Sequence, residues 1–226
     1  AQFETLAHDA ARTRFIGEVG LDFAGTRGEG EARERQTTAF DRALAACTGA
    51  GRTARAGTGE SATVCTGAAA RSDAGESATS ATSLASPTAV ARPTPPRRVI
   101  SLHAVRSAGA VLDALERSGA LDRHACVFHW FSGTSDELTR AVRAGCFFSI
   151  GPRMLATKRG RAYARAVPAN RLLLETDAPA RAGEPWSAAA WRAELEGSLS
   201  ALAAARGENA AQLAAALAQN SIALLA

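Results

Sequence analysis

Apolar and polar residues alternate along the chain in blocks that predict short buried strands separated by helices. The expected strands are residues 14–23, 98–103, 125–130, 146–151 and 171–177. Apolar residues at helical spacing predict helices over 35–49, 107–119, 135–145, 157–167, 186–206 and 208–218. Strands that alternate with helices of about ten residues are typical of βα units. The pattern therefore predicts an α/β fold built on a parallel sheet.

A long polar segment interrupts this pattern between the first predicted helix and the second predicted strand. From Thr53 to Arg98 the large apolar residues are Val64, Leu84 and Val90, and the rest is mostly Ala, Ser, Thr, Gly, Arg and Pro. Such a composition cannot bury enough apolar surface to offset the entropy of ordering the chain. We therefore predict a disordered insertion over residues 53–97 that interrupts a single domain spanning residues 1–226.

Composition and charge exclude several classes of protein. The hydrophobic fraction of 46% supports a sizeable core, but no uninterrupted run of 18 apolar residues suggests a membrane span. Four cysteines without a C-x-x-C pair rule out a zinc ribbon and make a disulfide framework unexpected, which predicts a cytoplasmic protein. The formal net charge of +4 is compatible with a polyanionic partner but does not require one. His124 falls in a predicted helix–strand loop, where we expect it to be solvated.

Four predicted strands carry a side chain that could bind a metal ion at or near their carboxyl ends. These side chains are Glu18, His103, His129 and Asp177. In parallel α/β folds, ligands bind beyond the carboxyl ends of the strands. Taken singly, each residue has an ordinary structural explanation, such as a salt bridge, a hydrogen-bonded core histidine or a turn. Together, two imidazoles and two carboxylates form a nitrogen and oxygen donor set that suits Zn²⁺, Mn²⁺ or Mg²⁺.

The same segments also carry a family resemblance. In chain order, FIGEVGLDF, a strand ending in His103, HWFSGT, FFSIGP and LLLETDAP resemble the TatD family of metal-dependent deoxyribonucleases. The segment QLAAALAQNSIALLA is similar to the closing helix of that family, so the resemblance covers about 180 residues, all but the insertion. The forms HWFSG and SIGPRML look most like the TatD-type nucleases of Qat anti-phage systems, which implies association with other anti-phage proteins.

The resemblance implies a TIM-type (β/α)₈ barrel and a site for divalent metal ions, two in a complete site. Glu18 would bridge the ions, and His103 and His129 would complete one metal position. Asp177 would bind the other ion and act as the catalytic base toward the attacking water. The metals would be Mg²⁺, Mn²⁺ or Zn²⁺, lowering the pKa of bound water and neutralising phosphoryl charge. The implied substrate is DNA, either single-stranded or at its ends.

Two features depart from the family pattern. The family opens with an H-x-H pair that ligates one metal, and this sequence contains none. Only thirteen residues precede Arg14, so roughly the first three barrel strands are expected to be missing. We therefore expect a fragment, a truncated gene product or a degenerate relative. A hydrolase of small molecules on the same scaffold and an inactive remnant stay open as alternatives.

The insertion joins a helix to a strand, which predicts that it lies opposite the catalytic rim.

Overall fold

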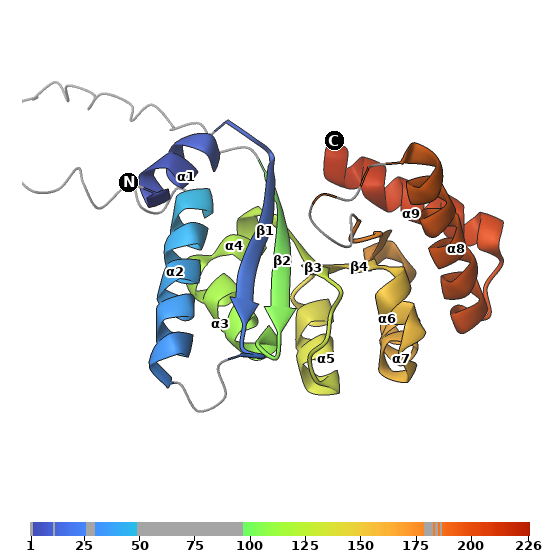
Figure 1. Cartoon of the computed structure of the whole chain (residues 1–226), viewed down its shortest axis with the longest axis horizontal. Helices are drawn as coiled ribbons and strands as arrows, with labels where there is room; N and C mark the ends of the chain where they lie inside the picture. Colours follow the sequence, from blue (N-terminus) through green and yellow to red (C-terminus); the bar gives the residue numbers. More distant parts are fainter. Residues whose placement is uncertain are drawn as a thin grey trace, which may run out of the picture.

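Five strands in the described part of the chain form one parallel sheet whose spatial order follows the sequence (Figure 1). The computed structural model describes residues 2–10, 12–25, 30–48, 97–178, 183, 185 and 187–226. The strands are β1 (Phe15–Asp22), β2 (Val99–Val105), β3 (Ala125–His129), β4 (Phe147–Ile150) and β5 (Leu172–Leu174). Every neighbouring pair is parallel, which confirms the predicted α/β sheet. The predicted insertion at 53–97 lies outside the described residues, except for Arg97.

Strand β5 is shorter than the predicted strand 171–177. The backbone N–H of Glu175 still donates to the Ile150 carbonyl at 3.2 Å, but the chain then leaves the sheet. Asp177 adopts a left-handed backbone with φ of 57°, which no strand accommodates. The predicted strand end is therefore a loop that turns back toward the sheet edge.

The helices match the predicted ones and add three more. They are α1 (Gln2–Ala10), α2 (Gly30–Thr48), α3 (Ala108–Ser118), α4 (Ala120–Arg123), α5 (Ser135–Arg143), α6 (Pro152–Ala156), α7 (Lys158–Ala166), α8 (Ala188–Arg206) and α9 (Ala210–Leu225). Helices α1, α4 and α6 were not predicted, and α9 continues beyond the predicted end at residue 218. No helix in the described ranges is long and apolar enough to cross a membrane.

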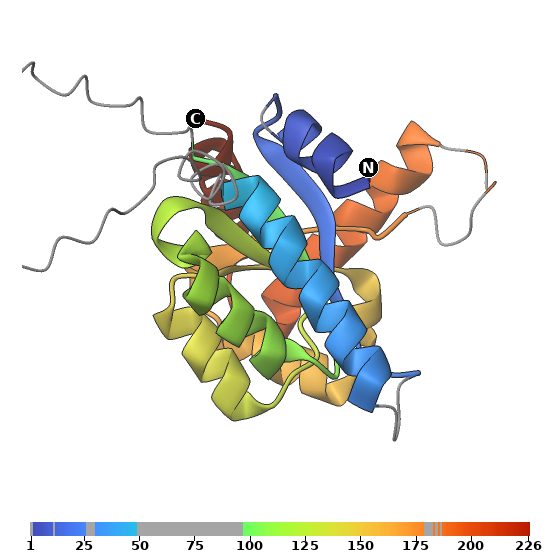
Figure 2. The same cartoon turned by 90° about the vertical axis from the view of Figure 1, so that its left-hand side faces the viewer.

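The two faces of the sheet bury different amounts of apolar surface. Ile100, Leu102 and Ala104 of β2 point into the main core, and α2 and α3 cover this face (Figure 2). The opposite face holds a smaller cluster made of Ala125, Val127 and Phe147, with partly buried residues beside it. Successive side chains of a strand alternate between the two faces of the sheet. A residue two positions after a member of this smaller cluster therefore points to the same face.

Strands β1 and β2 approach each other closely next to the carboxyl edge. A Cβ atom on Gly20 would lie 1.9 Å from the carbonyl oxygen of His103. Since no side chain fits there, only glycine allows the two strands to pair at this point. The pairing of Gly20 with His103 brings the polar end of β1 beside the polar end of β2.

The amino edge of the sheet is held by a buried arginine. Arg98 is 3% exposed, and its guanidinium donates to the carbonyl oxygens of Ala10 at 2.9 Å and Cys47 at 2.6 Å. These carbonyls lie in the last turns of α1 and α2, where unsatisfied acceptors and the helix dipole both favour a cation. The arginine therefore links two helix ends to the start of β2, at the edge opposite the strand carboxyl ends.

His124 is buried, contrary to the solvated position predicted for it. Its ring is 4% exposed, and its Nδ1 accepts the backbone N–H of Arg98 at 3.2 Å. Burial lowers the pKa of His124 to about 4, and the charges of Arg98 and Arg123 act in the same direction. Among the described residues, its Nε2 has no hydrogen-bond partner. The folded protein therefore holds this imidazole in its neutral form.

Glu137 caps two helices with one carboxylate. Its Oε2 accepts the N–H of Thr134 at 2.7 Å, which completes a capping box at the start of α5. Its Oε1 accepts the N–H of Gly109 at 2.7 Å, in the first turn of α3. One side chain thus satisfies an N-terminal donor in each helix and fixes the two helices relative to each other.

We expect Glu137→Ala to lower the free energy of unfolding by about 2 kcal/mol, because two charge-assisted hydrogen bonds to helix N-termini are lost. Urea unfolding followed by circular dichroism measures the change. Asp136→Ala removes an exposed acid from the same turn of α5. It should cost less than about 1 kcal/mol, through the helix dipole alone. Equal losses in the two variants would contradict the double cap.

We expect acid to destabilise the protein through His124. Unfolding restores the ordinary pKa, so the unfolded chain binds a proton that the folded chain excludes between about pH 6.5 and pH 4. Above that window the ring is neutral in both the folded and the unfolded chain, so His124 makes no pH-dependent contribution. The free energy of unfolding falls as the pH drops through the window. The expected loss between about pH 7.5 and about pH 4.5 is about 2 to 3 kcal/mol.

Urea unfolding at the two pH values tests this expectation against His124→Asn, whose amide oxygen can accept the Arg98 N–H without titrating. The variant should lose less stability on acidification than the parent protein. The same pH dependence in both proteins would assign acid sensitivity to other groups.

Candidate functional site

Polar side chains form a layer at the carboxyl edge, on the face of the sheet that carries the smaller apolar cluster. His129, Ser149 and Glu175 lie on neighbouring segments at this edge, and His129 pairs directly with Ser149. Each follows, two residues along its strand, an apolar residue of that face: Val127, Phe147 and Leu173. Strand alternation therefore directs all three polar side chains to the same side.

Glu175 joins the polar ends of three strands through one carboxylate oxygen. Its Oε2 accepts a hydrogen bond from Nδ1 of His129 at 2.5 Å and another from the Ser149 hydroxyl. The His129 and Glu175 side chains are only 16% and 13% exposed. The hydrogen bond to Glu175 raises the pKa of His129, burial opposes it, and the nearby carboxylates of Glu175, Glu18 and Asp177 add to the increase. With its proton on Nδ1, the neutral imidazole presents the lone pair of Nε2 to the carboxyl edge.

Glu175 was not among the site residues predicted from the sequence. Its signal was present in the segment LLLETD, because Glu175 lies two residues beyond Leu173 and so shares its face. The three consecutive leucines of β5 obscure the alternation that would have revealed it. Asp22, which lies 3.7 Å from Nε2 of His103, was missed as well.

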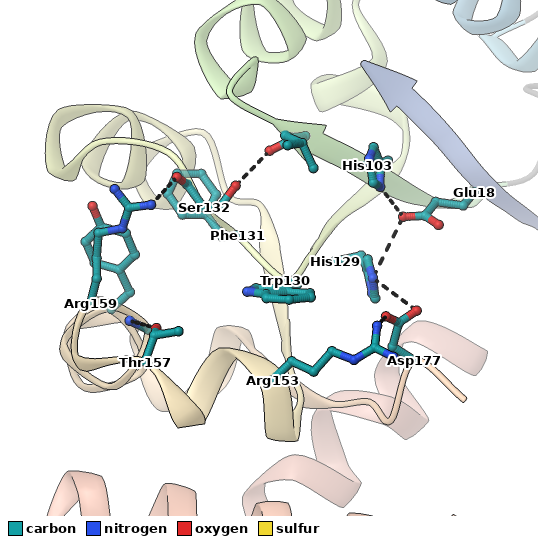
Figure 3. Close-up of a pocket in the computed structure, with 14 residues that line it drawn as sticks. Glu18, His103, His129, Trp130, Phe131, Ser132, Arg153, Thr157, Arg159 and Asp177 are labelled. Carbon is teal, nitrogen blue, oxygen red and sulfur yellow. Dashed lines mark hydrogen bonds and ion pairs between the residues drawn. The ribbon is translucent and has the colours of Figure 1, made fainter. Parts of the chain in front are cut away.

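The four predicted site residues meet at this edge (Figure 3). Nε2 of His129 lies 3.6 Å from Oδ1 of Asp177 and 3.9 Å from Oε1 of Glu18. The same Glu18 oxygen lies 3.1 Å from Nδ1 of His103. The structure thus places Glu18, His103, His129 and Asp177 in one continuous row, although they come from four separate segments of the chain.

A register shift in β1 brings Glu18 into this row. The pairing of β1 with β2 is regular at Ile16 and resumes at Val19, with an irregularity between them. A bulge of this kind redirects the side chains it contains and often occurs next to functional sites. Glu18 lies within the irregular segment and reaches across to His103.

Asp177 is held from its other side by an arginine. Nη1 of Arg153, from helix α6, donates to Oδ2 of Asp177 at 2.6 Å. Oδ2 is therefore occupied, while Oδ1 faces His129. The ion pair fixes which oxygen of Asp177 is available to a ligand or to substrate.

Backbone strain is concentrated around the same edge. In the described ranges, the residues other than glycine with positive φ are Arg106 (55°), Trp130 (40°) and Asp177 (57°). Arg106 and Trp130 come directly after β2 and β3, and Asp177 comes shortly after β5. Left-handed backbone is costly for such residues, and it persists mainly where function or the surrounding structure requires it.

A cavity of about 500 Å³ opens beside these residues. Glu18, His103, His129 and Asp177 line one part of it, and the end of β2, the β3–α5 loop and the α6–α7 segment line the rest (Figure 3). The volume lies within the range of small-molecule and cofactor sites. The candidate site therefore combines converging titratable groups with room for a ligand.

The donor set suits a divalent ion, but its side chains lie slightly too far apart to hold one. Two donors of a tetrahedral ion with bonds of about 2.1 Å are about 3.4 Å apart. The distances of 3.6 and 3.9 Å from His129 to Asp177 and Glu18 exceed this value. Accordingly, no three His, Cys, Asp or Glu side chains in the described part are arranged as ligands of one ion. The bond from His129 to Glu175 is nevertheless the kind of contact that orients metal-binding histidines.

Comparison with known proteins gives consistent matches. A segment of 58 residues is 45% identical to the 3'-5' ssDNA/RNA exonuclease TatD of Dickeya dadantii and covers 24% of this chain and 22% of that protein. A segment of 95 residues is 32% identical to human deoxyribonuclease TATDN3 and covers 39% of this chain and 33% of that protein. These matches therefore span a third or less of the length of each curated relative.

The fold is shared with solved structures. The Escherichia coli TatD homologue YJJV superposes with a TM-score of 0.63 at 22% identity, over 98% of this chain and 69% of that one. An amidohydrolase from Saccharomyces cerevisiae gives a TM-score of 0.62 at 15% identity, over 98% and 68%. These similarities support the TIM-type α/β fold expected from the sequence. Because the family model of TatD related DNase matches residues 75–226, more than half of the sequence, the chain belongs to the TatD related DNase family.

Proposed function

We propose that the protein hydrolyses phosphodiester bonds of single-stranded DNA or RNA with the help of divalent metal ions at the carboxyl edge. The observation that carries this proposal is the orientation of His129, whose Nδ1 is held by Glu175 while Nε2 faces Asp177 and Glu18. The names of the relatives from Dickeya dadantii and human, an exonuclease and a deoxyribonuclease, support nucleic acid as the substrate class.

We assign Glu18, His103, His129 and Asp177 as the metal ligands. Glu18, His103 and His129 would hold one ion, and Glu18 with Asp177 would contribute to a second. Nitrogen and carboxylate donors of this kind suit Zn²⁺, Mn²⁺ or Mg²⁺. Movements of a few tenths of an ångström would bring the observed separations to those of bound ligands.

Asp177 is the residue we assign as proton acceptor. Its Oδ2 is held by Arg153, so Oδ1 is the atom that would take a proton from the attacking water. Arg153 also brings a fixed positive charge to the place where a phosphate would lie. Bound metal ions would supply Lewis-acid activation of the water and charge neutralisation of the phosphoryl group.

Several finer expectations stay predictions. They include the number and identity of the ions, the cytoplasmic location and an association with other anti-phage proteins. Hydrolysis of a small molecule and an inactive remnant, which the missing H-x-H pair would explain, are alternative outcomes of the test below. Cleavage of a small amide or phosphotriester without cleavage of DNA would favour the first, and metal binding without any hydrolysis would favour the second.

We expect Asp177→Asn to reduce nucleotide release from single-stranded DNA at least about 100-fold, because an amide cannot accept the proton from water.

His129→Ala should weaken the binding of Mn²⁺ or Zn²⁺, measured by calorimetry, since a ligand is lost. His8→Ala serves as the matched control, because His8 is exposed on α1. Unchanged ion binding in His129→Ala would refute the proposed ligand set, whatever the activity.

We expect Glu175→Gln to weaken metal binding by about 10- to 100-fold without removing a ligand, because the amide no longer fixes the His129 ring as a carboxylate does. Glu194→Gln, an exposed change of the same kind on α8, should leave binding unchanged. Calorimetric titration of both variants with Zn²⁺ measures the difference. Equal affinities would show that Glu175 serves only the packing of the sheet edge.

A further inference from the structure

The cavity has a second end that the proposed hydrolysis does not use. Its acidic lining residues, Glu18 and Asp177, lie together with the histidines, whereas the rest of the lining includes Trp130, Thr157 and Arg159. Figure 3 shows the indole of Trp130 edge-on near the middle of the cavity, with His129 and Asp177 on one side and Arg159 and Thr157 on the other. An aromatic surface therefore separates a negatively charged end from a positively charged one.

Trp130 occupies this position at a conformational cost. Its φ of 40° is left-handed, which is unusual for a bulky side chain and which glycine or asparagine would adopt more easily. The ring is partly buried against the core, so it retains contact with the cavity. A smaller residue would relieve this backbone strain, so the presence of tryptophan points to a role for the aromatic ring itself.

Contacts with the neighbouring strands and with helix α7 hold the loop that carries Trp130. Phe131 packs edge-to-face against Phe128 and Phe148, with ring centroids 5.3 and 5.7 Å apart. The hydroxyl of Ser132 donates to the Ala104 carbonyl at 3.1 Å, and the hydroxyl of Tyr163 donates to the Gly133 carbonyl at 2.8 Å. These contacts hold the loop that carries Trp130, and the indole itself packs against the core.

Arg159 extends this surface with a cation. Its Nη2 donates to the Ser132 carbonyl at 3.1 Å, which holds the guanidinium against the same loop. A guanidinium has five N–H donors, and the hydrogen bond to Ser132 uses one of them within the described part of the chain. The remaining donors suit a phosphate oxygen, for which the planar guanidinium is well shaped.

We propose that Trp130 stacks against one base of a single-stranded nucleic acid and that Arg159 binds a phosphate of the same strand. The proposal rests on the hydrolytic function above and adds the subsite that positions the strand next to the site of cleavage. Stacking on an aromatic side chain accepts any base, and phosphate binding is independent of sequence. The subsite would therefore bind single strands without strong sequence preference.

Binding of a short fluorescein-labelled single-stranded DNA, followed by fluorescence anisotropy in EDTA, tests the stacking without hydrolysis. We expect Trp130→Asn to weaken binding by about ten-fold or more, and Trp130→Phe to restore most of it. Trp191→Ala, an exposed tryptophan of α8, is the matched control and should bind normally. Asparagine suits the left-handed backbone but removes a partly buried ring, so a cooperative thermal unfolding transition should confirm that the variant is folded. Unchanged affinity of Trp130→Asn would overturn the proposal.

Abasic residues identify the contact on the nucleic acid. Replacing one nucleotide at a time with an abasic one should weaken binding to the parent protein at one position, and should cost Trp130→Asn nothing further there. An equal cost in both proteins would overturn the stacking.

Arg159→Gln should reduce the slope of log Kd against log salt concentration by about 0.7, whereas Lys158→Gln, which does not line the cavity, should leave it unchanged.

These measurements separate the subsite from the hydrolytic function. A protein that binds DNA through Trp130 and one base, but releases no nucleotide with Mg²⁺, Mn²⁺ or Zn²⁺, supports the subsite and contradicts the hydrolysis. A protein that cleaves DNA but binds it equally well after Trp130→Asn supports the hydrolysis and overturns the subsite.

Discussion

One carboxylate just beyond β5 connects the polar ends of β3, β4 and β5 and fixes the orientation of His129 at the carboxyl edge. Glu175 binds the ring of His129 from β3 and the hydroxyl of Ser149 from β4, in a setting where all three side chains are partly or fully buried. Without it, an imidazole and a hydroxyl would lose their partner away from water, which is costly. With it, Nε2 of His129 has a fixed direction, and Asp177 and Glu18 gather around that atom.

The parallel sheet explains why the four residues of the candidate site could be expected to lie together. The strands are mainly apolar, each has a polar residue at, near or just beyond its carboxyl end, and parallel pairing brings all the carboxyl ends to one edge. Glu18, His103, His129 and Asp177 were therefore predictable as neighbours from their places at strand ends. The spacing of apolar residues likewise indicated the five strands and most helices.

Other features depend on contacts between distant segments, which local patterns do not encode. The burial of His124 follows from its bond to the backbone of Arg98, 26 residues away in the sequence. Helix α1 is tied to β2 by the buried guanidinium of Arg98, which binds the Ala10 carbonyl. The left-handed backbone of Trp130 has no signal in composition or periodicity. In each case, tertiary packing decides between local conformations that the sequence alone leaves open.

The distribution of charge gives the site its chemical character. Glu18, Asp22, Glu175 and Asp177 surround the two imidazoles, and Arg153 contributes a single permanent positive charge beside them. The bond to Glu175 and the surrounding carboxylates raise the pKa of His129, so the cluster attracts a positive charge even in the form of a proton. A divalent ion would satisfy the same demand more fully and would displace that proton. Trp130 and Arg159 lie beyond this negative region, where the proposed nucleic acid strand would meet an aromatic surface and a cation instead of carboxylates. In the proposed arrangement, metal ions would bind at the acidic end and the strand at the other, so the two ligands would not compete for the same groups.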